Sequence, residues 1–139
     1  MLKQLLRDDR GASAIEFAIA AQVLVALIWG IFQVGLVFQA NAGMQHALGE
    51  AARLAVVWPY AGDDAIKNRV LAKKFGTYNG TLAALDVSDV TKTTGSGASA
   101  VTTVVGKDLT LTYDQKLNFL FIPGPTVHLS RSKRVYLAA

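Results

Sequence analysis

The feature that most constrains this chain is a long uncharged stretch near its N-terminus. From Phe17 to Gly49 the sequence contains no Asp, Glu, Lys or Arg. A transmembrane helix needs about 20 apolar residues, and the segment from about Ala14 to Phe38 meets that length without a proline to interrupt it. The run is too long for a secretory signal peptide, whose apolar region is about 7–15 residues. The sequence therefore predicts a membrane-spanning helix.

The helical pattern continues beyond the expected span. From Asn41 to Val57 apolar residues recur at spacings of three and four, which is typical of an amphipathic helix. Pro59 ends the pattern, because the residue before a proline is disfavoured in the helical conformation. We expect one long helix within residues 12–58, of about 40 residues and roughly 60 Å at 1.5 Å per residue. Its first half would lie in lipid and its second half would project from it.

Residues 59–139 predict a small head, so the fold class expected for the chain is α+β. A second helix should begin at a cap on Asp63 or Asp64 and run to about Phe75, where Gly76 ends it. Residues 77–81 look like a loop. The period then becomes strand-like, and the expected elements are a strand at Ala84–Thr91, a Gly/Ser/Thr-rich tip at residues 92–100, a hairpin of Val101–Val105 and Leu109–Tyr113 about residues 106–108, an irregular apolar segment at Asn118–Ile122, and a last strand at Thr126–Leu137.

Three or four antiparallel strands cannot bury an apolar face by themselves. The amphipathic part of the long helix is the expected cover for this sheet. In the last strand Val127, Leu129, Val135 and Leu137 share one side, and Arg131 and Lys133 interrupt it. We therefore expect this strand to extend past the core or to bulge at the two cations.

No residue pattern supports catalysis, a metal site or a cofactor. His46 and His128 are far apart in the sequence and have no partners at ligand spacing, so both are interpreted as surface polar residues. The pair Asp63-Asp64 is interpreted as a helix cap before a metal site. The chain has no cysteine, which excludes disulfides and thiolate metal sites.

The charge balance gives weak support to a nucleic-acid partner. The net charge is +4 and the pI is about 9.5, but only 17% of the residues are charged. A cluster near the C-terminus could contact phosphate backbones or lipid headgroups, but an ordinary solvated strand end is the favoured interpretation. Its members are Arg131, Lys133 and Arg134.

A single acid, Glu16, stands at the mouth of the apolar stretch. A carboxylate costs on the order of 2.5–3.5 kcal/mol at a bilayer centre and less near the interface, so an acid here suggests a function. The residues before it include Lys3, Arg7 and Arg10. Because cytoplasmic flanks are rich in Lys and Arg, the N-terminus is expected in the cytoplasm and the head outside it.

The stretch Gly11-Ala-Ser-Ala-Ile-Glu-Phe17 resembles the N-terminus of a type IV prepilin: a short charged leader ending in Gly, a small residue next, Glu five residues past the Gly, and an aromatic after it. The longer sequence to about residue 58 resembles the TadE-like pseudopilins of tight-adherence (Flp) pilus systems. Two positions depart from the family pattern, since members commonly carry a proline where this chain has Gln22 and an acid where it has Gln33.

The resemblance implies a residue-by-residue reading of this stretch. Residues 1–11 would be a leader, and a prepilin peptidase would cut the bond between Gly11 and Ala12. Glu16 and Phe17 would then be the fifth and sixth residues of the mature chain. The cut creates an α-amino group at Ala12, and Glu16 could pair with the amine of a neighbouring subunit, which would offset the burial of both charges and fix the axial register. The alternative is a hydrated Glu16 that marks the membrane edge.

The resemblance also implies a pilin-like, non-enzymatic subunit of the bacterial inner membrane that acts in pilus assembly and adhesion. Expected partners are the prepilin peptidase, other pilin-like helices, the inner-membrane assembly platform and membrane lipid, with no nucleic acid. A second hypothesis is an uncleaved bitopic adaptor of the assembly apparatus. A third is a DNA-binding minor pilin that uses Arg131, Lys133 and Arg134.

Overall fold

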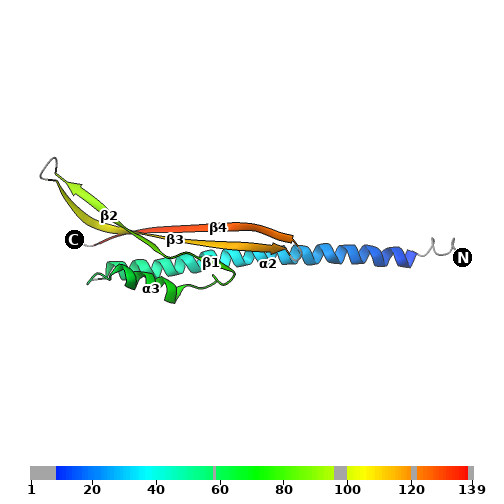
Figure 1. Cartoon of the computed structure of the whole chain (residues 1–139). Coiled ribbons are helices and arrows are strands. Elements are labelled where there is room, and N and C mark those ends of the chain that lie inside the picture. Colours follow the sequence, from blue (N-terminus) through cyan, green and yellow to red (C-terminus); the bar gives the residue numbers. More distant parts are fainter. Residues whose placement is uncertain (1–8, 58, 96–99, 120–121, 138–139) are drawn as a thin grey trace.

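The long helix predicted from the sequence is present and uninterrupted. The computed structural model describes residues 9–57, 59–95, 100–119 and 122–137. Helix α2 spans Asp9–Val56, 48 residues, which corresponds to about 72 Å. It extends well beyond the rest of the molecule at its N-terminal end (Figure 1). The helix ends shortly before Pro59, as the proline rule requires.

A second helix, α3, runs from Asp63 to Lys73 beside the C-terminal half of α2 (Figure 1). Ile66 and Val70 turn inward and are buried. The prediction of an aspartate cap is wrong, because the N-cap is Gly62 and no side chain caps the helix. The two aspartates lie in its first turn, where a negative charge is favourable near the positive end of the helix dipole. After α3 the chain turns at Gly76, which has a φ of 70°.

Four antiparallel strands form one sheet with the longest strand at its centre. The strands are β1 (Gly80–Leu82), β2 (Asp86–Thr94), β3 (Val101–Phe119) and β4 (Ile122–Tyr136). Strand β3 pairs with β1 and β2 along one edge and with β4 along the other. The outer end of the β2–β3 ribbon curves away from α2 (Figure 1). The turn that joins β2 to β3 begins at Gly95, and residues 96–99 of the predicted tip lie outside the described residues.

The predicted hairpin about residues 106–108 is wrong, because β3 is continuous through them. Gly106 lies opposite Val90 and Tyr136, and a Cβ added there would collide with the carbonyl oxygen of Val135. The β2–β3 register shifts next to this position, between Val90 and Thr91. A bulge beside a glycine bends a strand and increases its twist, so Gly106 allows close packing and curvature here rather than a turn.

Two other boundaries differ for related reasons. The expected loop at residues 77–81 contains the start of β1, where Gly80 passes so close to Tyr113 and the carbonyl of Asp114 that a Cβ would not fit. The expected last strand begins at Ile122 rather than Thr126, and it includes Pro123 and Pro125. Strand β4 pairs only with β3, and an edge strand tolerates proline because one row of its N–H groups is unpaired.

The core lies between the C-terminal half of α2, the inner face of the sheet and α3. The alternation predicted for Leu109–Tyr113 is confirmed, since Leu109, Leu111 and Tyr113 are all buried. The apolar face predicted for residues 41–57 is buried at Met44, Ala47, Leu48, Ala51 and Ala55, and the buried residues of α2 are mostly small: Ala40, Met44, Ala47, Leu48, Ala51, Ala52 and Ala55. The long helix therefore covers the sheet, and the α+β class is confirmed.

Candidate functional site

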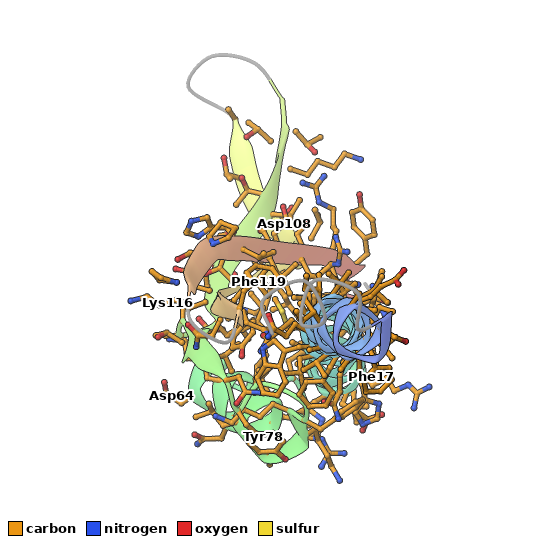
Figure 2. The ribbon with its side chains drawn as sticks, turned by 90° about the vertical axis from the view of Figure 1, so that its right-hand side faces the viewer. Phe17, Asp64, Tyr78, Asp108, Lys116 and Phe119 are labelled. Carbon is orange, nitrogen blue, oxygen red and sulfur yellow. The ribbon has the colours of Figure 1, made fainter. Side chains whose placement is uncertain are left out.

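The N-terminal part of α2 projects from the head as a free segment, defined here as Gly11–Ile28. Its large apolar side chains are exposed on every side of the helix, from Phe17 at 76% to Val25 at 53%. The most apolar 18-residue window of the helix has 0% of its residues buried, and its length and composition would allow it to cross a membrane. Figure 2 looks along the helix from this end and shows Phe17 pointing outward, away from the sheet. One apolar helix of this kind fits a single-pass membrane protein.

The predicted cleavage and pairing residues all lie at the exposed tip of this segment. Gly11, Ala12, Glu16 and Phe17 are helical and exposed. A Cβ added at Gly11 would meet no described atom within 4 Å. Ala12 and Glu16 are four residues apart, so they lie one above the other on the same face of the helix. The stretch is thus accessible, but no described residue of the head contributes to it.

An amine at Ala12 would be the first group of the helix after a cut at Gly11. It would stand at the positive end of the helix dipole, where an added positive charge is unfavourable and a carboxylate is favourable. Glu16 lies one turn further along the same face, within the first turns where the dipole acts. The helix dipole would therefore favour the carboxylate of Glu16 near an N-terminus created at Ala12.

Contact with the head begins at Trp29. The indole Nε1 of Trp29 donates a hydrogen bond to the carbonyl oxygen of Asn118 at 2.6 Å, near the end of the β3–β4 hairpin. A Cβ at Gly30 would touch the ring of Phe119 at 3.9 Å. One turn beyond Trp29, Gln33 is only 7% exposed. This glutamine, one of the departures from the family pattern, is therefore covered in the structure.

The covered segment of α2, defined here as Trp29–Val56, is held to the head by small residues and polar contacts. A Cβ on Gly43 would collide with the backbone of Phe75, so the chain after α3 approaches the helix closely. Arg131 of β4 donates from Nε to Oδ1 of Asn41 at 2.7 Å. That contact explains why a cation interrupts the inner side of β4. Glu50 accepts bonds from Arg53 and from Arg69 of α3, each at 3.1 Å.

The three cations of the C-terminal cluster do not form one basic surface. Arg131 reaches the helix, whereas Lys133 lines a shallow groove of about 340 Å³ on the covered segment. The groove is lined by Gln45, His46, Gly49, Glu50, Arg53 and Lys133. Arg134 points to the other side of the sheet and makes a two-bond contact with Asp108, at 2.7 and 2.6 Å. The hydrogen bond from Arg134 holds the pKa of Asp108 below its usual range.

The two histidines lie apart on the surface, as the sequence predicts. The ring of His46 packs beside Phe75 with centroids 5.7 Å apart, and Nδ1 of His128 is 2.6 Å from Oδ1 of Asp114. Both histidines are exposed. Among the described residues no three His, Cys, Asp or Glu side chains gather in a way that could hold a metal ion. Asp63, a candidate cap, instead accepts a 2.7 Å bond from Lys107.

The helix that carries these features matches a known protein family. The family model described as TadE-like protein matches residues 11–53. Residues 11–53 are similar to that family. The match begins at Gly11 and includes the free segment and most of the covered segment. Comparisons with curated proteins and with solved structures gave no match.

The TadE-like region and the site coincide, while the sheet lies outside the matched residues. The family is pilus-associated and pilin-like, and it is structural rather than catalytic. The structure places the Gly11–Phe17 stretch at the exposed end of the helix, and the cleavage and pairing roles of its residues stay predictions. The sequence did not reveal the boundary at Trp29, because Trp29 and Phe32 look like any other apolar residues of the run. The apolar segment at Asn118–Ile122 is related to that boundary, but the fold is needed to bring Asn118 and Phe119 to the helix.

Proposed function

We propose that this chain is a minor pilin-like subunit of a Tad/Flp-type pilus or secretion machine, acting in pilus assembly and adhesion. The observation that carries the proposal is the free segment: a TadE-like helix, apolar on every side, that leaves the head at Trp29 and ends at the Gly11–Phe17 stretch. Such a surface is stable only in lipid or against other apolar helices. A subunit that moves from membrane to helical bundle needs both environments.

In this proposal the N-terminus faces the cytoplasm and the head lies in the periplasm. A prepilin peptidase cuts between Gly11 and Ala12, and the mature helix then packs with other pilin-like helices at the assembly platform. The carboxylate of Glu16 pairs with the Ala12 amine of a neighbouring subunit. In a water-poor bundle each charge then neutralises the other, while an unpaired charge there would be costly.

N-terminal sequencing of the membrane-extracted protein tests the cleavage. We expect the wild-type chain to begin at Ala12 and a Gly11→Leu variant to retain Met1. Gly35→Leu is the matched control, because a Cβ at Gly35 also meets no described atom within 4 Å and Gly35 is remote from the cut. Identical processing of Gly11→Leu and wild type would contradict the cleavage proposal.

Two variants of Glu16 test the pairing. Glu16→Ala and Glu16→Asp should both be processed, since the cut bond and the leader are unchanged. We expect Glu16→Ala to lose pilus assembly and Glu16→Asp, which keeps the charge, to retain part of it. Equal pilus output from Glu16→Ala and wild type would count against the pairing.

One observation favours a second candidate, the uncleaved adaptor. Helix α2 begins at Asp9 and runs without a break through the Gly11–Ala12 bond. A peptide bond inside a helix must unwind before a peptidase can cut it, which opposes cleavage. Recovery of Met1 from assembled, pilus-producing cells would establish the adaptor and exclude the processed subunit.

A further inference from the structure

The length of the free segment fixes where the head can stand relative to a bilayer. Gly11–Ile28 contains 18 residues, or about 27 Å of helix, close to the roughly 30 Å hydrocarbon thickness of a bilayer. With Gly11 at one face, Trp29 therefore lies at the opposite interface. Trp and Tyr are enriched at this level because their rings are apolar and carry one polar group.

The sheet could not enter the hydrocarbon beyond that level. A span that continued to Phe38 would take the hydrogen bond of Trp29 with Asn118, and the end of the hairpin, into the lipid core. Within the described part of the chain β4 pairs with β3 alone, so its outer edge carries unpaired backbone groups. Such an edge costs several kcal/mol for each group left unsatisfied in lipid. The open edge therefore keeps the head at the interface or above it.

The end of the hairpin has the composition of a surface that meets an interface. Phe119 of the hairpin is 38% exposed, and on the helix Trp29 is 37% and Phe32 is 55% exposed. The rings of Trp29 and Phe32 lie 5.8 Å apart, and Trp29 is hydrogen-bonded to Asn118, the neighbour of Phe119, so aromatic side chains from the helix and the hairpin share one end of the head. The indole N–H of Trp29 is already satisfied by Asn118, which leaves its ring free to contact apolar groups.

Two further features suit a headgroup environment. Pro123 and Pro125 lie at the start of β4 and have no N–H groups to leave unpaired. Lys116 is exposed on β3 three residues before Phe119. A lysine at that distance from the apolar end can reach lipid phosphates through its flexible side chain.

We propose that the described residues on either side of the β3–β4 connection, including Asn118, Phe119 and Pro125, rest in the headgroup layer of the outer leaflet at the level of Trp29, and so set the depth to which α2 is inserted. The partner is the lipid interface itself. This inference rests on the membrane span in the proposed function. It adds a second membrane contact from a segment that is distant in the sequence, since Trp29 and Asn118 are 89 residues apart. The head would then be a depth stop and not a freely tethered domain.

Single-cysteine variants test the proposed depth directly, because the wild-type chain contains no cysteine. The labelled positions would be Phe119→Cys at the hairpin end, Leu24→Cys in the free segment and Val104→Cys on the outer ribbon, where the side chain is 47% exposed. Each full-length variant carries a spin label and is reconstituted at one chain per phosphatidylcholine/phosphatidylglycerol nanodisc. Collision with oxygen, which concentrates in lipid, and with a nickel chelate, which stays in water, reports depth.

We expect the Leu24 label to collide mainly with oxygen and the Val104 label mainly with nickel. The Phe119 label should lie between them, with several-fold less nickel collision than the Val104 label. A label at Pro125→Cys, also exposed at the hairpin end, should agree with it, which guards against local damage by the Phe119 substitution.

The opposing outcomes separate the two proposals. If the Phe119 and Val104 labels collide equally with nickel while the Leu24 label stays in lipid, the depth stop is wrong and the span stands. If the Phe119 label is shielded from both reagents, protein covers it and the lipid assignment is overturned. If the Leu24 label is exposed to nickel, the membrane span fails, and with it the inference.

Discussion

The two segments of α2 belong to one helix and yet meet opposite surroundings. The free segment carries large apolar side chains on all sides, such as Ile19 at 59% and Leu24 at 58% exposed. The covered segment buries a stripe of mainly small side chains, with Ala47 and Ala51 at 0%. Nothing in the backbone changes at Trp29, where one segment gives way to the other.

The difference shows that cover by the head divides the helix, because only the inward face changes at Trp29: on the outward face large side chains continue, with Ile31 at 66% and Phe38 at 68% exposed. Small residues on the covered segment let the sheet and α3 come close, so the helix surface there becomes part of a core. Large residues on the free segment are exposed in the described part of the chain and present their surface to lipid or to other helices. The helix can therefore connect two independent packing systems, and substitutions should affect one system without the other.

The largest expected effect comes from truncating the core opposite the covered segment. Leu111→Ala removes a side chain that is 1% exposed and should destabilise the head by about 2–5 kcal/mol. Leu24→Ala is the matched control, since it makes the same truncation on the free segment and should leave head unfolding unchanged. The measurement is guanidinium unfolding of the full chain in nonionic detergent, followed by tryptophan and tyrosine fluorescence. Similar midpoints for the two variants would remove the distinction between the segments.

A smaller effect on stability is expected where the backbone of Phe75 passes close to α2. A Cβ at Gly43 would press on the backbone of Phe75, and overpacking of this kind costs about 1–3 kcal/mol. Alanine has a better helix propensity by about 1 kcal/mol, so Gly43→Ala should be destabilising by less than the packing cost alone.

Gly49→Ala controls for helix propensity, because a Cβ there meets no described atom within 4 Å. It should be neutral or stabilising by up to about 1 kcal/mol. Thermal unfolding of both variants gives the contrast. Stabilisation by Gly43→Ala to the same degree as Gly49→Ala would mean that the approach of Phe75 to the helix is not a tight one.

The sequence predicted the elements of this contrast better than their connections. The amphipathic period of the covered segment and the alternation at Leu109 and Leu111 report burial directly, because each period matches a regular element. The turns predicted at two glycines are wrong for a physical reason. A glycine permits either a turn or a close approach, and Gly80 and Gly106 serve close approaches to strands that are distant in the sequence.

Ion pairs between residues far apart in the sequence could not be predicted from it either. Lys107 and Asp63 are 44 residues apart, and no local pattern links them. The Gly11–Phe17 stretch could be selected as a candidate site because its signal is contained in seven consecutive residues. The boundary at Trp29 was not predictable, since it depends on how far a hairpin reaches along the helix.

The third effect concerns the ion pairs that fasten α3 to the sheet beside the covered segment. The Nζ of Lys107 donates to Asp63 of α3 at 2.7 Å and to Asp89 of β2 at 2.8 Å. Lys107→Met should leave both carboxylates without their cation and cost about 1–2 kcal/mol, since the two aspartates are half exposed. Lys67→Met is the control, because Lys67 is an exposed lysine of α3. Chemical unfolding at neutral pH compares the variants, and equal midpoints would show that the pairs do not fasten α3.

The same lysine gives an alkaline signature. The hydrogen bond to Asp63, followed by that to Asp89, raises the pKa of Lys107 above its ordinary value of 10.5. Its stabilisation is therefore fully present below about pH 10.5 and declines as the pH rises through the folded-state pKa. Burial also raises the pKa of Tyr113, which adds a loss in the same direction above pH 10. The difference between wild type and Lys107→Met isolates the lysine, and it should shrink as the solution becomes strongly alkaline.

The smallest effect is expected on the sheet face that points away from α2. There Arg134 and Asp108 form a solvent-exposed ion pair. The hydrogen bond from Arg134 lowers the pKa of Asp108 below its ordinary value of 3.8. Because the folded-state pKa is depressed, the stabilisation is present above about pH 4 and is lost as the pH falls through the folded-state value. Arg134→Gln should change the unfolding midpoint little at pH 7, since exposed pairs are screened by water. The acid-side decline should be shallower in the variant than in wild type. A large drop in the unfolding midpoint of Arg134→Gln at pH 7 would contradict this prediction. It would mean that side chains on the outer face of the sheet contribute as much to the stability of the head as the core does.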